Sequence, residues 1–176
     1  MIEKIISRRS IRNFQDEKIE KDIILKILEA GRWAPSGLNN QPWEFIVVKS
    51  ENKDRLAKCT KYSEIIRSAP VCIAVYYNKR RGYSYVKDIQ GVAAAMQNML
   101  LAIHLLGLGG VWLGEILNQK DEVNEILENP DSTEFMGVIA FGEIPENIKL
   151  TNRSRYPLSK IVHEEKFGNN YVEDSE

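Results

Sequence analysis

Two basic segments near the ends of the chain carry residue types that bind phosphate. Residues 7–14 read SRRSIRNF and residues 151–158 read TNRSRYPL, so each segment places at least two arginines around a serine. A guanidinium can hold phosphate oxygens through paired, charge-assisted hydrogen bonds. Two interpretations stay open from spacing alone, a shared phosphate site and two separate solvated basic surfaces, because one sequence does not show whether the segments meet.

A third candidate is the loop over residues 34–43, which reads APSGLNNQPW. Such a loop can offer backbone N–H and C=O groups and amide side chains to a flat polar ligand. A helix stop followed by a strand start explains its prolines and its glycine. That simpler interpretation leaves Asn39, Asn40 and Gln41 unexplained, so a binding role and a connecting role are both retained.

The glycine cluster over residues 107–114, GLGGVWLG, does not fit a nucleotide-binding turn. A dinucleotide turn needs G-x-G-x-x-G after a strand and before a helix. Here the cluster follows a predicted helix, and Trp112 occupies the sixth position. The chain also lacks the G-x-x-x-x-G-K-[ST] loop, so neither a Rossmann site nor a nucleotide triphosphatase is indicated.

Metal and side-chain nucleophile chemistry are poorly supported by the sequence. The chain has two histidines, His104 and His163, and two cysteines, Cys59 and Cys72, and none of them lies at ligand spacing. We expect His104 to be a core histidine with one satisfied ring nitrogen. No serine sits in a G-x-S-x-G elbow, so we predict no metal site and no catalytic side chain.

Length and composition predict one ordinary globular domain over residues 1–176. The net charge is −1, with 43% hydrophobic and 28% charged residues, which argues against a general nucleic-acid binder and against disorder. Two cysteines suit a reducing compartment. The first ten residues, MIEKIISRRS, lack the apolar stretch of a secretory signal, so we expect a cytoplasmic protein.

Hydrophobic periodicity predicts strands separated by helices. We expect helices over residues 21–33, 53–61, 89–108 and 120–127, strands over 43–48, 71–77 and 134–142, and a short extended piece within 107–114. This alternation indicates an α+β or an α/β sandwich with a central sheet.

The helix over residues 89–108 is apolar on nearly all sides, yet Gln90, Gln97, Asn98 and His104 interrupt it. These polar groups indicate a core helix of a soluble protein and no membrane span. A chain of this size has few other helices to cover such a surface. A second subunit is one solution.

Taken in order, these segments resemble the FMN-dependent nitroreductase family along nearly the whole chain. The resemblance rests on SRRSIRNF, APSGLNNQPWEFIVV, the long alanine- and leucine-rich helix closing in GLGGVWLG, VIAFGEIP and RSRYPLSKIV. It implies an α+β, three-layer sandwich with a central, mostly antiparallel sheet flanked by helices. It also implies an obligate homodimer that exchanges elements between subunits and binds FMN at the interface.

The same resemblance implies three groups of cofactor-binding residues. The phosphate and pyrimidine side of FMN would meet Arg8, Arg9, Ser10 and Arg12, with Arg153 and Arg155 closing on the phosphate. The ring would be lined by Pro35, Ser36, Gly37 and Asn39 of the other subunit. The backbone of Leu113, Gly114 and Glu115 would lie near flavin N5.

The implied activity is hydride transfer from NAD(P)H to flavin N5, followed by electron transfer to a flat, electron-poor acceptor such as a nitroaromatic or a quinone. A flavin carrier or redox sensor without turnover shares every implied contact, and relatives also act as dehalogenases or dehydrogenases. The acceptor and the preferred nicotinamide stay open. Tyr83 and Tyr85 are candidates for capping the site, and ordinary surface tyrosines are the other interpretation.

Overall fold

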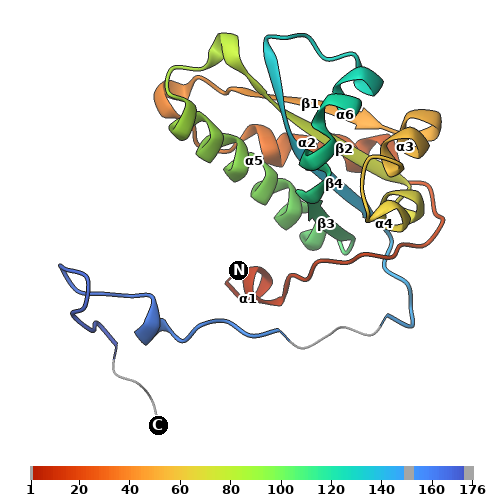
Figure 1. Ribbon diagram of the computed structural model, residues 1–176. Helices are drawn as coiled ribbons and strands as arrows, with labels where there is room; N and C mark the ends of the chain where they lie inside the picture. Colours follow the sequence, from red (N-terminus) through yellow and green to blue (C-terminus); the bar gives the residue numbers. More distant parts are fainter. Residues whose placement is uncertain (1, 149–152, 173–176) are drawn as a thin grey trace.

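The computed structural model describes residues 2–148 and 153–172, and a four-stranded sheet forms its centre (Figure 1). The strands are β1 (Trp43–Val48), β2 (Val71–Asn78), β3 (Gly109–Leu113) and β4 (Thr133–Gly142). They lie in the order β1-β2-β4-β3, and every neighbouring pair is antiparallel. The structure confirms the α+β fold and the predicted strand regions.

Helices cover both faces of this sheet, as the continuous apolar sequence of β2 requires. Successive strand residues point to opposite faces. Ile73 and Val75 therefore join one core, and Ala74 and Tyr76 join the other. The first core is covered by α2 (Lys21–Arg32) and α5 (Tyr85–Leu105), and the second by α3 (Ser50–Ala57), α4 (Ser63–Ser68) and α6 (Lys120–Leu127) (Figure 1).

The long apolar helix α5 begins four residues earlier than the sequence predicts and ends three residues earlier. It begins early because the Asp88 carboxylate accepts the free backbone N–H groups of Tyr83 and Ser84. It ends before Gly107, whose φ of 83° is a left-handed turn that glycine adopts without strain. No helix within the described ranges has the length and apolar character needed to cross a bilayer.

The helix expected over residues 53–61 corresponds to α3, which begins three residues earlier and ends four residues earlier than predicted. A break separates it from a second short helix, α4, that the sequence pattern does not predict. Thr60 explains the break, because its hydroxyl accepts the backbone N–H of Tyr62 at 3.1 Å and so competes with helix continuation. A further short helix, α1 (Ile2–Ser7), was not expected from the sequence.

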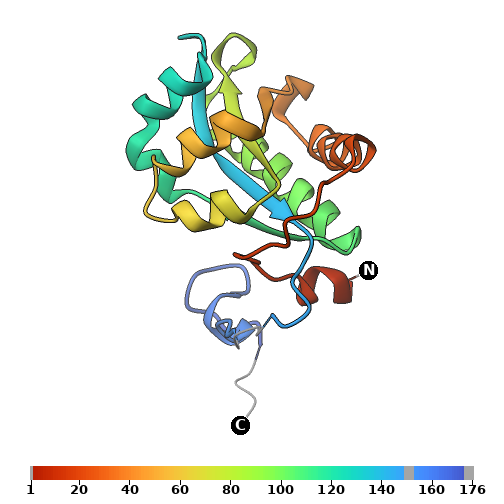
Figure 2. The same ribbon diagram turned by 90° about the vertical axis from the view of Figure 1, so that its right-hand side faces the viewer.

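The two ends of the chain lie close together on one side of the domain. Ser10 forms a parallel bridge with Gly110 of β3, and the Ile11 N–H donates to the Gly110 carbonyl at 3.1 Å. Residues 153–172 extend away from the body as an arm below the N-terminal segment in both views (Figures 1 and 2). The arm exposes large apolar side chains, among them Phe167 with 96% of its surface accessible.

Candidate functional site

Arginines from both ends of the chain converge beside β3. Arg153 donates from Nη1 to the Arg8 carbonyl oxygen at 2.7 Å. The pKa of Arg153 lies below its ordinary value because of desolvation first and then because of the charges of Arg9, Arg155 and Arg8. The pKa of Arg8 is lowered by burial first and then by Arg155. The structure therefore favours one shared basic site over two separate basic surfaces.

This arginine cluster (Arg8, Arg9, Arg153 and Arg155) holds a buried donor with no acceptor among the described residues. Arg9 Nη1 is buried and has no hydrogen-bond partner among the described residues. None of the salt bridges between described residues involves a member of the cluster. A buried, unpaired donor on a charged group is costly, and neighbouring cations repel one another. The arrangement is that of an anion-binding cradle.

Residues 10–12, which follow the arginine cluster in the N-terminal segment, are held along β3. Ile11 packs onto Gly109, where a Cβ atom would lie 2.7 Å from the Ile11 Cβ, so this position requires glycine. Arg12 Nη1 lies 3.4 Å from the Ser10 carbonyl oxygen that accepts its hydrogen bond. The edge of β3 thus holds Ser10 and Arg12 in register with the arginine cluster.

A cavity of about 290 Å³ continues from Arg12 along the end of β3. Its lining contains four of the predicted residues and four that the sequence did not single out: Arg12, Leu113, Gly114 and Glu115, and Tyr62, Ile65, Val111 and Trp112. The predicted cofactor residues of the first and third groups are therefore neighbours in this fold. No local pattern identifies Tyr62 or Trp112, because each reaches the cavity only through the packing of α4 and β3.

Glu115 fixes one wall of this cavity. Its Oε2 accepts the Thr60 hydroxyl at 2.5 Å, and the Thr60 oxygen in turn accepts the Tyr62 backbone N–H. The hydrogen bond from Thr60 is the main reason that the Glu115 pKa lies below its ordinary value, with the Lys61 backbone and charge adding to it. Glu115 is thus a carboxylate that holds the turn before Tyr62.

The loop with Pro35, Ser36, Gly37 and Asn39 lies elsewhere. Its Pro35 carbonyl and Ser36 pack against Gly91 of α5, which covers the sheet face opposite to α4. Ser7, beside the arginine cluster, instead contacts His104 of α5 at 3.0 Å. Gly91 and His104 are thirteen residues apart, which is about 20 Å along a helix. One chain therefore carries the ring-lining loop and the phosphate-side residues as two separate groups.

The tyrosines near this loop have different partners. A Cβ atom on Gly37 would collide with the Tyr83 hydroxyl, so the Tyr83 ring packs directly against the loop. Tyr85 instead donates its hydroxyl to Glu134 at 3.1 Å. The Nε2 of His104 is satisfied by Ser7, as the sequence predicts, but the expectation of a core histidine is wrong, because His104 is half-buried and belongs to neither core.

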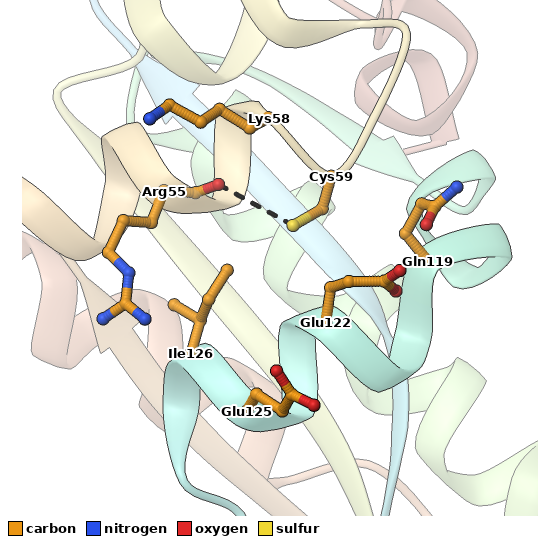
Figure 3. A pocket seen from close by; sticks show the side chains of 7 residues that line it. All are labelled: Arg55, Lys58, Cys59, Gln119, Glu122, Glu125 and Ile126. Carbon is orange, nitrogen blue, oxygen red and sulfur yellow. Dashed lines mark hydrogen bonds between the residues drawn. The ribbon is translucent and has the colours of Figure 1, made fainter.

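A larger cavity, of about 530 Å³, opens between α3 and α6 (Figure 3). Its lining carries Arg55 and Lys58 from one side and Glu122 and Glu125 from α6, so it contains two positive and two negative side chains. The pKa of the Cys59 thiol in its wall is raised by burial first and by Glu122 second, which disfavours the reactive thiolate. None of the predicted cofactor residues lines this cavity, and we do not assign it a function.

Comparison with known proteins supports the sequence resemblance. The chain matches the family described as the Nitroreductase family over residues 5–61 and 52–143. A provisionally named NADH dehydrogenase/NAD(P)H nitroreductase of Methanothermobacter thermautotrophicus is 33% identical over 150 residues, which are 84% of this chain and 78% of the relative. The NADPH-flavin oxidoreductase of Vibrio harveyi is 28% identical over 181 residues, covering 94% and 74% of the two chains.

Solved structures agree with these matches. A protein of Desulfovibrio desulfuricans, provisionally named a nitroreductase and crystallised in complex with FMN, is 44% identical. The superposition covers 94% of this chain and 96% of that chain with a TM-score of 0.87.

Proposed function

Because this chain belongs to the nitroreductase family, we propose that it is an NAD(P)H-dependent oxidoreductase that uses FMN and reduces flat, electron-poor acceptors. The observation that carries the proposal is the convergence of Arg8, Arg9 and Arg153 with a buried guanidinium donor that has no partner among the described residues. A nitroaromatic or a quinone is the acceptor class that we expect.

The arginine cluster fits the phosphate of FMN chemically. A phosphate dianion accepts several hydrogen bonds, and each one from a charged donor is worth about 1.5–3 kcal/mol. We assign this contact to Arg8, Arg9, Arg153 and Arg155, with the Ser10 hydroxyl beside them. A bound dianion would also offset the two causes that lower the pKa values of Arg8 and Arg153, which are burial first and the repulsion between neighbouring arginines second.

The cavity beside Arg12 fits the reacting end of the cofactor. When bound, FMN supplies the centre that accepts hydride from NAD(P)H and returns electrons to the acceptor. Arg12 would place positive charge at the pyrimidine edge and so favour the more negative, reduced ring. Leu113, Gly114 and Glu115 would present backbone groups, while Tyr62 and Trp112 would provide apolar walls for a flat acceptor.

We further propose that two copies of the chain, each a single domain over residues 1–176, complete each site. Pro35, Ser36, Gly37 and Asn39 would reach the ring from the partner, because within one chain they lie on the other side of the sheet. The outer side of α5 offers Val86 and Leu105 as exposed apolar side chains for a partner. The arm over residues 153–172 exposes further apolar side chains in the same way.

A cytoplasmic location is proposed on the two cysteines, both of which are free thiols. Free, buried thiols suit a reducing compartment.

The test is to add FMN to the purified protein, remove excess and oxygen, and mix the yellow complex with NADH or NADPH. The expected result is bleaching within seconds and return of colour when a quinone or a nitroaromatic is added. A protein that does not retain FMN would overturn the proposal. Persistent yellow colour with both donors would instead support a flavin carrier or sensor without turnover.

A further inference from the structure

Asp88 is a buried carboxylate near the ring-lining loop. Only 1% of its surface is accessible. Oδ2 accepts the backbone N–H groups of Tyr83 and Ser84, both at 2.9 Å, and the Tyr77 hydroxyl at 3.3 Å. Burial by itself raises the pKa of Asp88, but hydrogen bonds, first the one from the Asn40 side chain and then those from Ser84, Tyr83 and Tyr77, leave this pKa below its ordinary value. The three hydrogen bonds to Oδ2 make this oxygen the cap at the start of α5.

The other carboxylate oxygen of Asp88, Oδ1, binds the loop and not the helix start. It accepts Asn40 Nδ2 at 2.6 Å, and the same amide donates to the Arg81 carbonyl at 2.9 Å. Asn40 directly follows the short 3-10 helix Gly37–Asn39. Asp88 therefore connects the start of α5 with the end of the loop that we assign to the flavin ring.

This loop has a conformation that the chain would not hold without support. Leu38, Asn39 and Gln41 have φ values of 55°, 53° and 46°. Non-glycine residues in this left-handed region carry strain, and leucine and glutamine have no side-chain feature that favours it. Within the loop, the Ser36 hydroxyl oxygen accepts the Gln41 N–H at 3.0 Å. The bond from Asn40 ties this strained segment to the buried carboxylate of Asp88, and Arg81 Nη1 donates to the Gln41 carbonyl oxygen at 3.1 Å.

Resting on the proposed function, we infer that Asp88 and Asn40 form a positioning pair that sets the geometry of the ring-lining loop and thereby the binding and reduction of FMN. Neither residue is assigned a contact with the cofactor. They act through Gly37 and Asn39, and through Tyr83, whose backbone Asp88 binds and whose ring packs against Gly37.

The variant Asp88→Asn distinguishes the two roles of this side chain, which are capping α5 and binding Asn40. Its amide oxygen can still accept the N–H groups of Tyr83 and Ser84, so the helix cap is retained. Its NH₂ group then faces the NH₂ group of Asn40. The two side chains can pair only if the Asn40 amide turns over, which breaks its hydrogen bond to the Arg81 carbonyl, so the loop loses one of its two bonds in either arrangement. In the double variant D88N/N40D, the amide introduced on α5 can donate to the carboxylate introduced in the loop, which restores the link to α5 with donor and acceptor exchanged, while the hydrogen bond to the Arg81 carbonyl stays lost.

The matched control is Asn98→Ala. Asn98 also lies on α5 and donates to a distant backbone group, the Ala30 carbonyl at 3.1 Å, but it does not touch the loop. This variant reports what a loss of α5 stability alone does to the holoenzyme.

The experiment measures FMN dissociation constants, the visible circular dichroism of the FMN-saturated proteins, their rates of reduction by NADH, and melting temperatures. We expect Asp88→Asn to weaken FMN binding by up to about tenfold, because binding must then order the loop without one hydrogen bond to a charged group, and to change the dichroism of the bound flavin. D88N/N40D should recover affinity to within about threefold of the wild type, and Asn98→Ala should change the melting temperature alone. Wild-type affinity and dichroism in Asp88→Asn would overturn the inference while the proposed function stands; failure of the wild-type protein to bind FMN would overturn the proposed function itself.

Discussion

Arg153 binds the backbone of Arg8 with an Nη1 to carbonyl oxygen distance of 2.7 Å, although 145 residues separate them in the sequence. This hydrogen bond uses one guanidinium nitrogen and leaves the other donors of Arg153 beside Arg9 and Arg155. It therefore aligns the arm with the N-terminal segment and concentrates positive charge where no carboxylate among the described residues balances it. The first two predictions concern that charge.

Arg153→Ala should weaken FMN binding about 10- to 100-fold, because each hydrogen bond from a charged donor contributes about 1.5–3 kcal/mol. Arg153→Lys should recover only part of the affinity, since an ammonium cannot form the paired fork. Titration of FMN fluorescence quenching gives both dissociation constants. Arg32→Ala is the control, because Arg32 forms an exposed ion pair with Glu29 on α2. An unchanged dissociation constant in Arg153→Ala would remove Arg153 from the site.

Arg155→Gln should raise the melting temperature of the FMN-free protein by about 1–3 °C at low salt, the shift expected for relief of a surface charge interaction in a chain of this size. The reason is that, after burial, the charge of Arg155 contributes to the lowered pKa values of both Arg8 and Arg153. The same variant should lower the melting temperature of the FMN complex. Calorimetry with and without FMN measures both, and the gain should fade near 0.5 M salt. A lower melting temperature of the FMN-free variant would contradict the repulsion between Arg155 and the other arginines of the cluster.

Mixed dimers test whether a site is shared between two chains. One parent carries Arg8→Ala with Arg153→Ala, and the other carries Gly37→Val, whose side chain collides with Tyr83. Each parent alone should be inactive. If the loop and the arginine cluster of one site come from different chains, each mixed dimer has one intact site, and the mixture recovers activity in proportion to the mixed dimer formed. Sites built within one chain would leave the mixture inactive.

Arg12→Ala should lower the two-electron potential of bound FMN, with an upper value on the order of 90 mV. The figure follows from an attraction of about 4 kcal/mol for charges about 4 Å apart at an effective dielectric near 20. Arg12→Lys keeps the charge and should lower the potential less. Equilibration with reference dyes measures the potential. An unchanged potential in Arg12→Ala would show that Arg12 does not lie near the flavin edge.

His104 should make the FMN-free protein less stable as the pH falls through about 6.5. Its pKa lies below the ordinary 6.5 because of burial first, and because of the charges of Lys4 and Arg8. The unfolded chain then binds the proton more readily than the folded one, so stability is lost as the pH falls. His104→Gln removes the proton site, keeps a hydrogen-bonding group for Ser7, and should flatten the dependence. Melting temperatures between about pH 5 and 8 check this, and equal slopes in both proteins would contradict it.

The order of apolar and polar residues predicted much of this fold, because a buried strand is a short, continuous apolar run in the sequence. The apolar runs that became β1, β2 and β4 were found within one residue of their observed ends. The boundaries of the helices were less well predicted, because they depend on side chains that cap or interrupt them. Asp88 extends α5 at its start, and Thr60 divides α3 from α4.

The sequence by itself determined the strand positions and the presence of two arginine-rich segments, since residue type and period suffice for each. Period alone left an α+β and an α/β sandwich open, and the family resemblance pointed to α+β. Only the tertiary structure decided that Arg153 meets Arg8, that Arg12 lies beside Leu113, Gly114 and Glu115, and that the Pro35 to Asn39 loop lies apart from them. The physical reason is that the edge of β3 and the length of α5 set these distances. Packing between segments far apart in the chain has no local pattern to reveal it.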